Sequence, residues 1–188
     1  MTDDNLWAPW RLSYLKDLVE QEKQGKAPQT GCFLCDAVGL PAFSPSAGDT
    51  AGDADVRSKA RSLLVLMKDD RGVLMLNRYP YTNGHLMVAG AHKAQLSDFT
   101  AEERAGLMEL TALGEQLLQT AVNCQGINVG INLGKAAGAG VPGHMHIHLV
   151  PRWAGDVNFM TTVGQVRVIP QALEESYDHL SDVLGKML

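Results

Sequence analysis

The feature that most constrains this chain is the segment HMHIHL, residues 144–149, in which three histidines alternate with apolar residues. A period of two is the pattern of a β-strand, whose side chains point to opposite faces in turn. The histidines therefore share one face and the apolar residues share the other. Three neighbouring imidazoles repel one another when charged, so their gathering on one face indicates chemistry. The segment predicts a strand with one core face and one chemical face.

A catalytic metal centre is the alternative interpretation of these histidines. Centres of that kind combine imidazoles with a carboxylate ligand placed close to them. Residues 149–152, LVPR, follow the last histidine here and supply no carboxylate. A metal-dependent active site is therefore the second choice.

The other elements follow from hydrophobic periodicity. Three apolar runs within 62–89, separated by turn-like sequences, predict a meander of antiparallel strands. Leucines at helical spacing predict a long helix between 97 and 122, capped by Ser97 or Thr100. Residues 127–134 and 144–151 predict two further strands, the last ended by Pro151, and 171–187 predict a C-terminal helix. We expect an α+β fold with an antiparallel sheet of about five strands, one long helix and a C-terminal helical extension.

Length and composition are those of one globular domain, because 188 residues with 45% hydrophobic and 20% charged side chains can bury a sizeable core. Residues 37–60 lack periodicity and predict a mobile loop, and 152–188 form a C-terminal extension of the single domain 1–188. The net charge of -5 gives no general attraction to nucleic acid or anionic membranes, so neither is expected as a partner. Without a signal-peptide pattern or a long apolar run, the expected location is cytoplasmic.

Two of the three cysteines, Cys32 and Cys35, have C-x2-C spacing. In a reducing compartment this spacing favours a metal site over a disulfide. A tetrahedral zinc needs two further ligands, which the spacing does not identify. Cys124 is expected as a buried core thiol.

The segments around the histidines resemble the histidine-triad superfamily, whose signature is three histidines alternating with apolar residues on the last strand of the domain. Residues 76–88, LNRYPYTNGHLMV, look like the family's nucleotide-binding strand pair, and residues 126–148 are similar to its phosphate-binding segment. The segments WAPWR, PRWAGDVNFM and VIPQ look like the bacterial branch related to diadenosine tetraphosphate phosphorylases. The resemblance implies a homodimer.

The resemblance also implies the catalytic roles. His146 would attack the α-phosphate of a nucleotide and carry the nucleotidyl group as a phosphoramidate, while His148 helps the leaving group depart. The chemistry agrees, because an imidazole with a pKa near ~6.5 is largely neutral at pH 7 and attacks phosphorus without a strong base. A backbone carbonyl that accepts from its other ring nitrogen would fix the tautomer.

The implied substrate site is spread over three segments. Asn77 corresponds to the position that binds the ribose in relatives, although by itself it equally predicts a polar cap on a turn. Many relatives carry a hydroxyl where this chain has Gly140 and Val141, so its phosphate is expected to rely on backbone N–H donors. Trp153 is a candidate for stacking on a base. The implied phosphate cradle consists of Asn132, Lys135, Gly138, Ala139 and Gly140.

In triad proteins and in the similar galactose-1-phosphate uridylyltransferases that bind structural zinc, the two remaining ligands match His92 and His144. The expected zinc ligands are thus Cys32, Cys35, His92 and His144. Metal-free triad proteins also exist, so the alternative that the C-x2-C spacing arose by chance stays open. The other two histidines, His85 and His179, are expected to be structural or surface residues.

The predicted function is that of a nucleotide hydrolase or transferase, similar to diadenosine tetraphosphate phosphorylases and ATP adenylyltransferases. It would act on adenine nucleoside and dinucleoside polyphosphates, with phosphate or water as the acceptor. Two alternatives remain open, a purine nucleoside phosphoramidase and a nucleotide-binding scaffold without turnover. The scaffold alternative is retained because this chain lacks the hydroxyl at 140–141.

Overall fold

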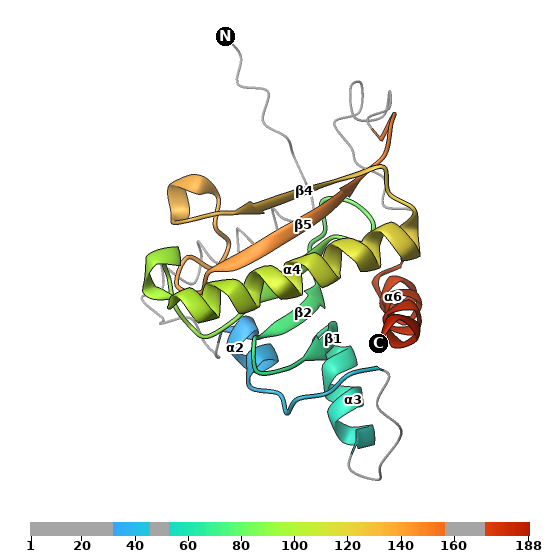
Figure 1. Cartoon of the computed structure of the whole chain (residues 1–188), viewed down its shortest axis with the longest axis horizontal. Coiled ribbons are helices and arrows are strands. Elements are labelled where there is room, and N and C mark those ends of the chain that lie inside the picture. Colours follow the sequence, from blue (N-terminus) through green and yellow to red (C-terminus); the bar gives the residue numbers. More distant parts are fainter. Residues whose placement is uncertain (1–31, 46–52, 157–171) are drawn as a thin grey trace, which may run out of the picture.

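The computed structural model of the chain describes residues 32–45, 53–156 and 172–188 (Figure 1). Its centre is an antiparallel sheet of five strands in the order β1-β2-β3-β5-β4. The strands are β1 (Val65–Lys68), β2 (Val73–Leu76), β3 (Leu86–Ala89), β4 (Gly126–Ile131) and β5 (His146–Arg152). The helices are α2 (Phe33–Val38), α3 (Asp53–Ser62), α4 (Ala101–Val122) and α6 (Leu173–Met187), with 3-10 turns at Leu96–Asp98 and Lys135–Ala137. The predicted α+β class and five-stranded sheet are confirmed.

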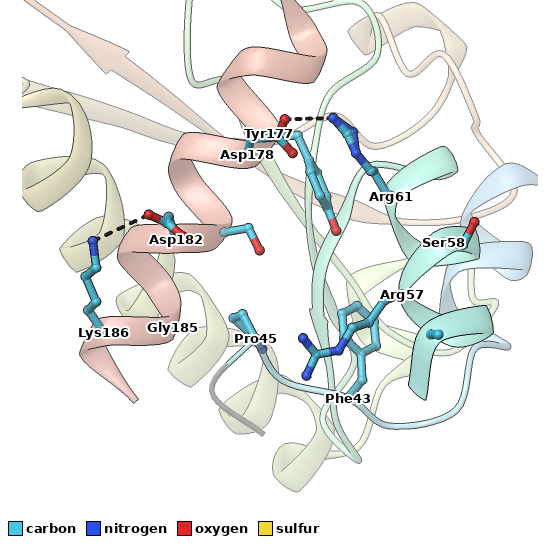
Figure 2. Close-up of a pocket in the computed structure, with 12 residues that line it drawn as sticks. Phe43, Pro45, Arg57, Ser58, Arg61, Tyr177, Asp178, Asp182, Gly185 and Lys186 are labelled. Carbon is cyan, nitrogen blue, oxygen red and sulfur yellow. Dashed lines mark hydrogen bonds and ion pairs between the residues drawn. The ribbon is translucent and has the colours of Figure 1, made fainter. Parts of the chain in front are cut away.

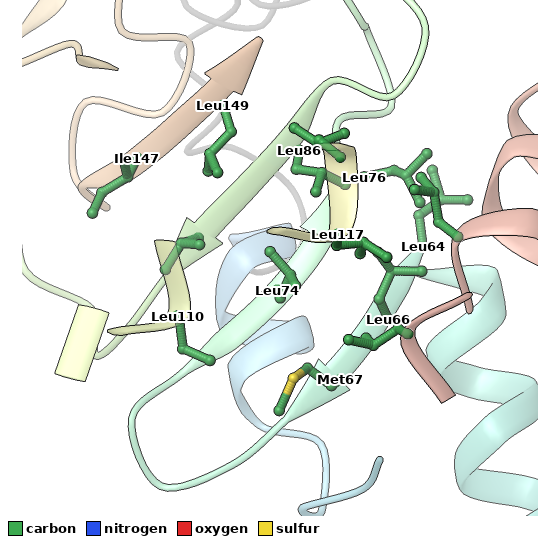
Figure 3. Packing of buried hydrophobic residues seen from close by; sticks show 14 of the residues in the cluster. Leu64, Leu66, Met67, Leu74, Leu76, Leu86, Leu110, Leu117, Ile147 and Leu149 are labelled. Atoms are coloured by element: carbon green, nitrogen blue, oxygen red, sulfur yellow. The ribbon is translucent and has the colours of Figure 1, made fainter. Parts of the chain in front are cut away.

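Helix α4 lies across one face of the sheet and forms the main core (Figures 1 and 3). A reciprocal capping box starts it, because the Thr100 hydroxyl accepts from the Glu103 N–H and the Glu103 carboxylate accepts from the Thr100 N–H. Gly114 lets the helix approach the sheet, since a Cβ there would lie 3.0 Å from Leu149 and 3.1 Å from Leu74. Burying a leucine in this interface contributes roughly 1.5–3 kcal/mol. No described helix, α4 included, is both long and apolar enough to cross a membrane.

Helix α6 confirms the predicted C-terminal helix and extends the same core. It packs against α4 and β1. Leu180 and Leu184 are buried in the α4 cluster. Tyr177 donates its hydroxyl to the Val65 carbonyl at 3.0 Å, which ties α6 to the start of β1. The described part of the C-terminal extension is therefore packed on the domain.

The prediction of a loop over 37–60 is wrong at both ends. Helix α2 reaches Val38, Phe43 pairs with Lys68 at the sheet edge, and α3 begins at Asp53. These helices lack a detectable period because each buries little: Ala60 is the only fully buried side chain described in α3. They cover the sheet face opposite α4. Residues 46–52, the middle of that segment, lie outside the described residues.

Pro151 does not end the last strand as predicted. Strand β5 runs on to Arg152, whose carbonyl accepts from the Gln125 N–H on the β4 side. Neighbouring residues turn their backbone groups to opposite edges, so the Pro151 nitrogen faces the β3 side. There β3 has already stopped, because Leu86, its first residue, pairs with Leu149. The missing N–H therefore costs no ladder bond, which is the condition under which a strand tolerates proline.

Candidate active site and metal centre

The three histidines and the three apolar residues of 144–149 turn to opposite faces, as the alternation predicts. Met145, Ile147 and Leu149 are buried in the α4 core. His146 and His148 pair with Ala89 and Met87 of β3 and lie on the α2 side. Their rings are 4.7 Å apart and line a small cavity. His144 precedes the strand, and its ring contacts His92 rather than the other two histidines of the triad.

The tautomer of His146 is fixed by the backbone. Its Nδ1 lies 2.9 Å from the His144 carbonyl oxygen, which only accepts hydrogen bonds, so Nδ1 carries the proton. The lone pair is then on Nε2. The ring is 5% exposed, and burial lowers its pKa more than the hydrogen bond to His144 raises it. The neutral, nucleophilic form is thereby favoured.

The tautomer of His148 is fixed through a fourth histidine. The Tyr81 backbone N–H donates to His85 Nδ1 at 3.1 Å, so the His85 proton lies on Nε2. His85 Nε2 is 3.1 Å from His148 Nδ1 and donates to it. The proton of neutral His148 is consequently on Nε2. Neutral His148 therefore presents an N–H donor on Nε2, whereas His146 presents a lone pair on Nε2.

His85 is the residue that sequence reasoning missed. It is completely buried and stacks on Tyr81 at 4.8 Å between ring centroids. The available signal was a histidine placed directly before the apolar run of β3, since a buried polar group needs partners. By contrast, His179 is an exposed residue that donates to the Ala121 carbonyl, as expected of a surface histidine.

Asn77 lines the cavity, and its amide is already used locally. Its Oδ1 accepts from the Tyr79 N–H at 2.9 Å, which is the turn-capping bond that the sequence allowed. Its Nδ2 lies 3.4 Å from His85 Nδ1. Asn77 therefore joins the turn to the histidine network. The remaining side chains of the cavity, also not predicted, are Phe33, Tyr79, Tyr81, Met87 and Val141.

Of the expected phosphate cradle, only Gly140 lines the cavity. The segment before it folds into a 3-10 turn whose flanking residues, Gly134 and Gly138, have φ of 82° and 86°, a conformation that favours glycine. Asn132 lies before this turn, Lys135 is in it, and Gly138 and Ala139 follow it. None of these four residues lines the cavity.

Trp153 and Arg152 are not brought to the cavity either. The Trp153 indole donates to the Val122 carbonyl at the end of α4. Arg152 pairs with Asp156 and donates to Asn128 at 3.0 Å. Both lie at the opposite end of β5 from His146.

A second cavity is larger than the histidine cavity but differs from it in chemistry. It lies between α3 and α6 and has about 940 Å3, against about 60 Å3 for the histidine cavity (Figure 2). Its walls carry two ion pairs, Arg61–Asp178 at 2.7 Å and Lys186–Asp182 at 3.4 Å. No histidine or cysteine lines it. Nucleophilic groups with oriented protons are found in the smaller cavity.

Cys32, Cys35, His92 and His144 come together beside the histidine cavity, with donor atoms within 4.8 Å of one another. His144 Nε2 donates to the Gly90 carbonyl at 2.9 Å, so the lone pair on Nδ1 faces Cys32 Sγ at 3.3 Å and Cys35 Sγ at 3.5 Å. His92 Nδ1 lies 3.0 Å from Cys35 Sγ. The four residues expected as ligands thus form one group able to hold a metal ion.

The electrostatics of this group fit a cation. Burial and the neighbouring Cys32 raise the pKa of the Cys35 thiol. Burial and the nearby His92 and His146 lower the pKa of His144. A bound cation favours the ionised thiolates, and it binds a neutral imidazole without any change in protonation. Two sulfurs and two nitrogens are the donor set of tetrahedral structural sites, and the Gly90 carbonyl supplies the outer bond that orients a ligating histidine.

A five-stranded antiparallel sheet with oriented histidines on its last strand, beside a Cys2His2 group, defines the class of protein. The HIT domain family model matches residues 59–155. The chain is 34% identical over 173 residues to the AP-4-A phosphorylase of Mycobacterium tuberculosis. The matched region covers 91% of this chain and 79% of that protein. This chain belongs to the HIT family.

Solved structures agree with that assignment. A zinc-bound histidine triad family protein from Mycobacterium smegmatis superposes with a TM-score of 0.55 at 29% identity, covering 66% of this chain and 85% of that one. A Plasmodium falciparum diadenosine triphosphate hydrolase in complex with cyclomarin A has a TM-score of 0.54, covers 93% of this chain and 96% of that one, and at 15% identity supports the fold alone.

Proposed function

We propose that this protein is a nucleotidyl-transferring enzyme that uses His146 as its nucleophile. The Nε2 lone pair attacks the α-phosphorus of a bound adenine nucleotide, an N–P bond forms, and the bond to the distal phosphates breaks. An oxygen of inorganic phosphate or water then attacks the same phosphorus and releases His146. The observation that carries this proposal is the bond from His146 Nδ1 to the His144 carbonyl, which leaves Nε2 as the nucleophilic atom.

His148 serves the leaving group in this proposal. Because His85 donates to its Nδ1, the neutral His148 ring carries its proton on Nε2. That N–H donates a hydrogen bond to the bridging oxygen as the α-phosphate bond breaks, which stabilises the negative charge that develops on the leaving group. In this proposal the nucleophile and the hydrogen-bond donor to the leaving group are two histidines whose ring centroids lie 4.7 Å apart.

The proposed substrate is diadenosine tetraphosphate or a close relative, with phosphate as acceptor and ADP and ATP as products. Support comes from the similarity to the mycobacterial AP-4-A phosphorylase over 91% of this chain. Phe33, Tyr79, Tyr81 and Met87 line the cavity and would form an apolar wall for the base, and Asn77 would bind the ribose. The cavity of about 60 Å3 is smaller than a nucleotide. The phosphates therefore extend along Gly140 toward Asn132, Lys135, Gly138 and Ala139.

Three further assignments belong to the same proposal. The metal is structural zinc, which suits two sulfurs and two imidazoles. The protein is a homodimer, because β4 is an edge strand of the described sheet, with Val129 49% exposed and Leu133 just beyond it 40% exposed. The unpaired cysteines fit the reducing cytoplasm.

Rapid quenching with intact-mass analysis tests the covalent step. Protein mixed with diadenosine tetraphosphate should carry an added AMP group, localised to His146 by peptide mapping. Labelled phosphate in the same reaction distinguishes the acceptors, since labelled ADP indicates phosphorolysis, whereas AMP with ATP indicates hydrolysis. Fast cleavage of adenosine phosphoramidates without reaction of the dinucleotide would assign the phosphoramidase activity instead. Tight nucleotide binding without any adduct would leave a scaffold.

A further inference from the structure

Helix α2 has one side in the core, another on the catalytic cavity, and its start in the metal centre. Leu34 and Ala37 are buried against the sheet face opposite α4. Phe33 is 38% exposed and lines the cavity beside His146 and His148. Cys32, the N-cap residue, and Cys35 supply both sulfurs of the metal-ligating group. Phe33 is therefore flanked on both sides along the chain by a metal ligand.

The described contacts that hold α2 are few. The helix has six residues, and Cys32 makes no side-chain cap bond to its first turn. Two buried apolar residues and the contacts of the two sulfurs with His92 and His144 fix its position. A metal ion bonded to all four donors would join α2 to His92, beyond β3, and to His144, before β5. Among the described contacts, loss of the ion leaves α2 held by its packing and by the weaker contacts of the two sulfurs with the imidazoles.

The nucleophile depends less on the ion. His146 is part of the ladder between β3 and β5, and its ring is held by a backbone carbonyl. His148 is held by His85 and paired with Met87. Strand pairing keeps these groups in place whether or not α2 moves. Strand pairing thus positions the two histidines, whereas the packing of α2 and the metal centre position Phe33.

We infer that the metal centre sets the nucleotide affinity of the catalytic cavity through Phe33, and leaves the orientation of the two catalytic histidines unchanged. Phe33 is a positioning residue for the base, and the ion fixes Phe33 by holding Cys32 and Cys35. This inference rests on the proposed function, because it takes the ligand of the cavity to be a nucleotide. By linkage, a nucleotide that packs on Phe33 must raise the metal affinity by the same factor.

The test is a cycle of four proteins: wild type and Phe33→Ala, each zinc-loaded and zinc-stripped. The readout is the calorimetric Kd of AMP and of a methylene-bridged ADP analogue. We expect Phe33→Ala and zinc removal each to weaken binding about tenfold, and the two together to do little more. The matched control is Leu96→Ala, a side chain of similar exposure, 37%, outside the cavity, which should bind like wild type. An unchanged Kd after stripping, or a full metal effect in Phe33→Ala, would overturn the inference.

The reciprocal measurement covers the case in which the stripped protein unfolds. Competition with a chromophoric chelator gives the zinc affinity of the folded, loaded protein with and without saturating AMP. AMP should raise it about tenfold in wild type and leave it unchanged in Phe33→Ala. Equal effects in both proteins would contradict the coupling. Failure of the proposed function has a different signature, namely no adduct on His146 in either metal state with the binding cycle intact.

Discussion

Two histidine clusters share strand β5 and its approach, and each is organised by a backbone carbonyl. In the catalytic cluster, His146 is bonded through Nδ1 to the His144 carbonyl, which exposes the Nε2 lone pair. In the metal cluster, His144 is bonded through Nε2 to the Gly90 carbonyl, which turns the Nδ1 lone pair toward the cysteines. The same residue type and the same kind of bond leave the lone pair on Nε2 in one cluster and on Nδ1 in the other. The ring nitrogen that donates to the carbonyl determines which nitrogen of the histidine keeps its lone pair.

The strongest test of this difference removes the nucleophile. His146→Ala should lower kcat by about 10⁴-fold or more, because no other group forms the covalent intermediate. AMP binding should remain measurable, since Asn77, Phe33 and Gly140 still line the cavity. His179→Ala is the matched control, because His179 is an exposed histidine of α6 that bonds to the Ala121 carbonyl near the end of α4 and does not line the cavity. Steady-state turnover by His146→Ala near the wild-type rate would refute the covalent mechanism.

The next test acts on His148 through its partner. His85→Leu removes the donor to His148 Nδ1 and should lower kcat about 10- to 100-fold with a small change in KM. His85→Gln retains a side-chain N–H and should recover part of the loss. A substrate with a good leaving group, such as a nitrophenyl ester of AMP, needs no hydrogen-bond donor at the leaving oxygen and should show a much smaller defect. Equal defects with both substrates would mean that His85 is only a packing residue.

Removing a sulfur from the metal cluster should lower the stability of the fold. Cys32→Ser and Cys35→Ser should abolish the one zinc expected per chain and lower the melting temperature by roughly 4–8 °C, for a loss of about 2 kcal/mol. Cys124→Ser is the matched control, because Cys124 lies outside the metal group. The readouts are metal analysis and thermal unfolding. Purified wild-type protein without metal, or cysteine variants as stable as wild type, would remove the structural role.

The sequence predicted the parts of the site that depend on local period. The alternation of 144–149 placed His146 and His148 on one face, and the leucine spacing placed α4. His85 escaped prediction because its role depends on the register between β3 and β5, which is set by tertiary pairing. Phe33 escaped because α2 is too short to show a period. Trp153 was expected to stack on the base because it follows the histidine strand closely, yet it lies beyond the far end of β5 and donates to the Val122 carbonyl.

The smallest expected effect is in the pH dependence of kcat/KM, and it separates a buried nucleophile from a solvent-exposed one. Burial lowers the pKa of His146 from its ordinary value of 6.5, because the charged ring loses its hydration. Only the neutral ring attacks phosphorus, so the acid limb due to this group should lie below pH 6.5. A cation held by the neighbouring His144 acts in the same direction, since positive charge disfavours protonation. At pH 6.5, where an exposed imidazole is half protonated, more than half of the enzyme should remain in the active form.

Single-turnover rates at subsaturating substrate between pH 5 and 8, together with NMR titration of the His146 ring, measure this limb. A limb at or above pH 6.5 would mean that water reaches the ring and that the bond to the His144 carbonyl alone orients the nucleophile.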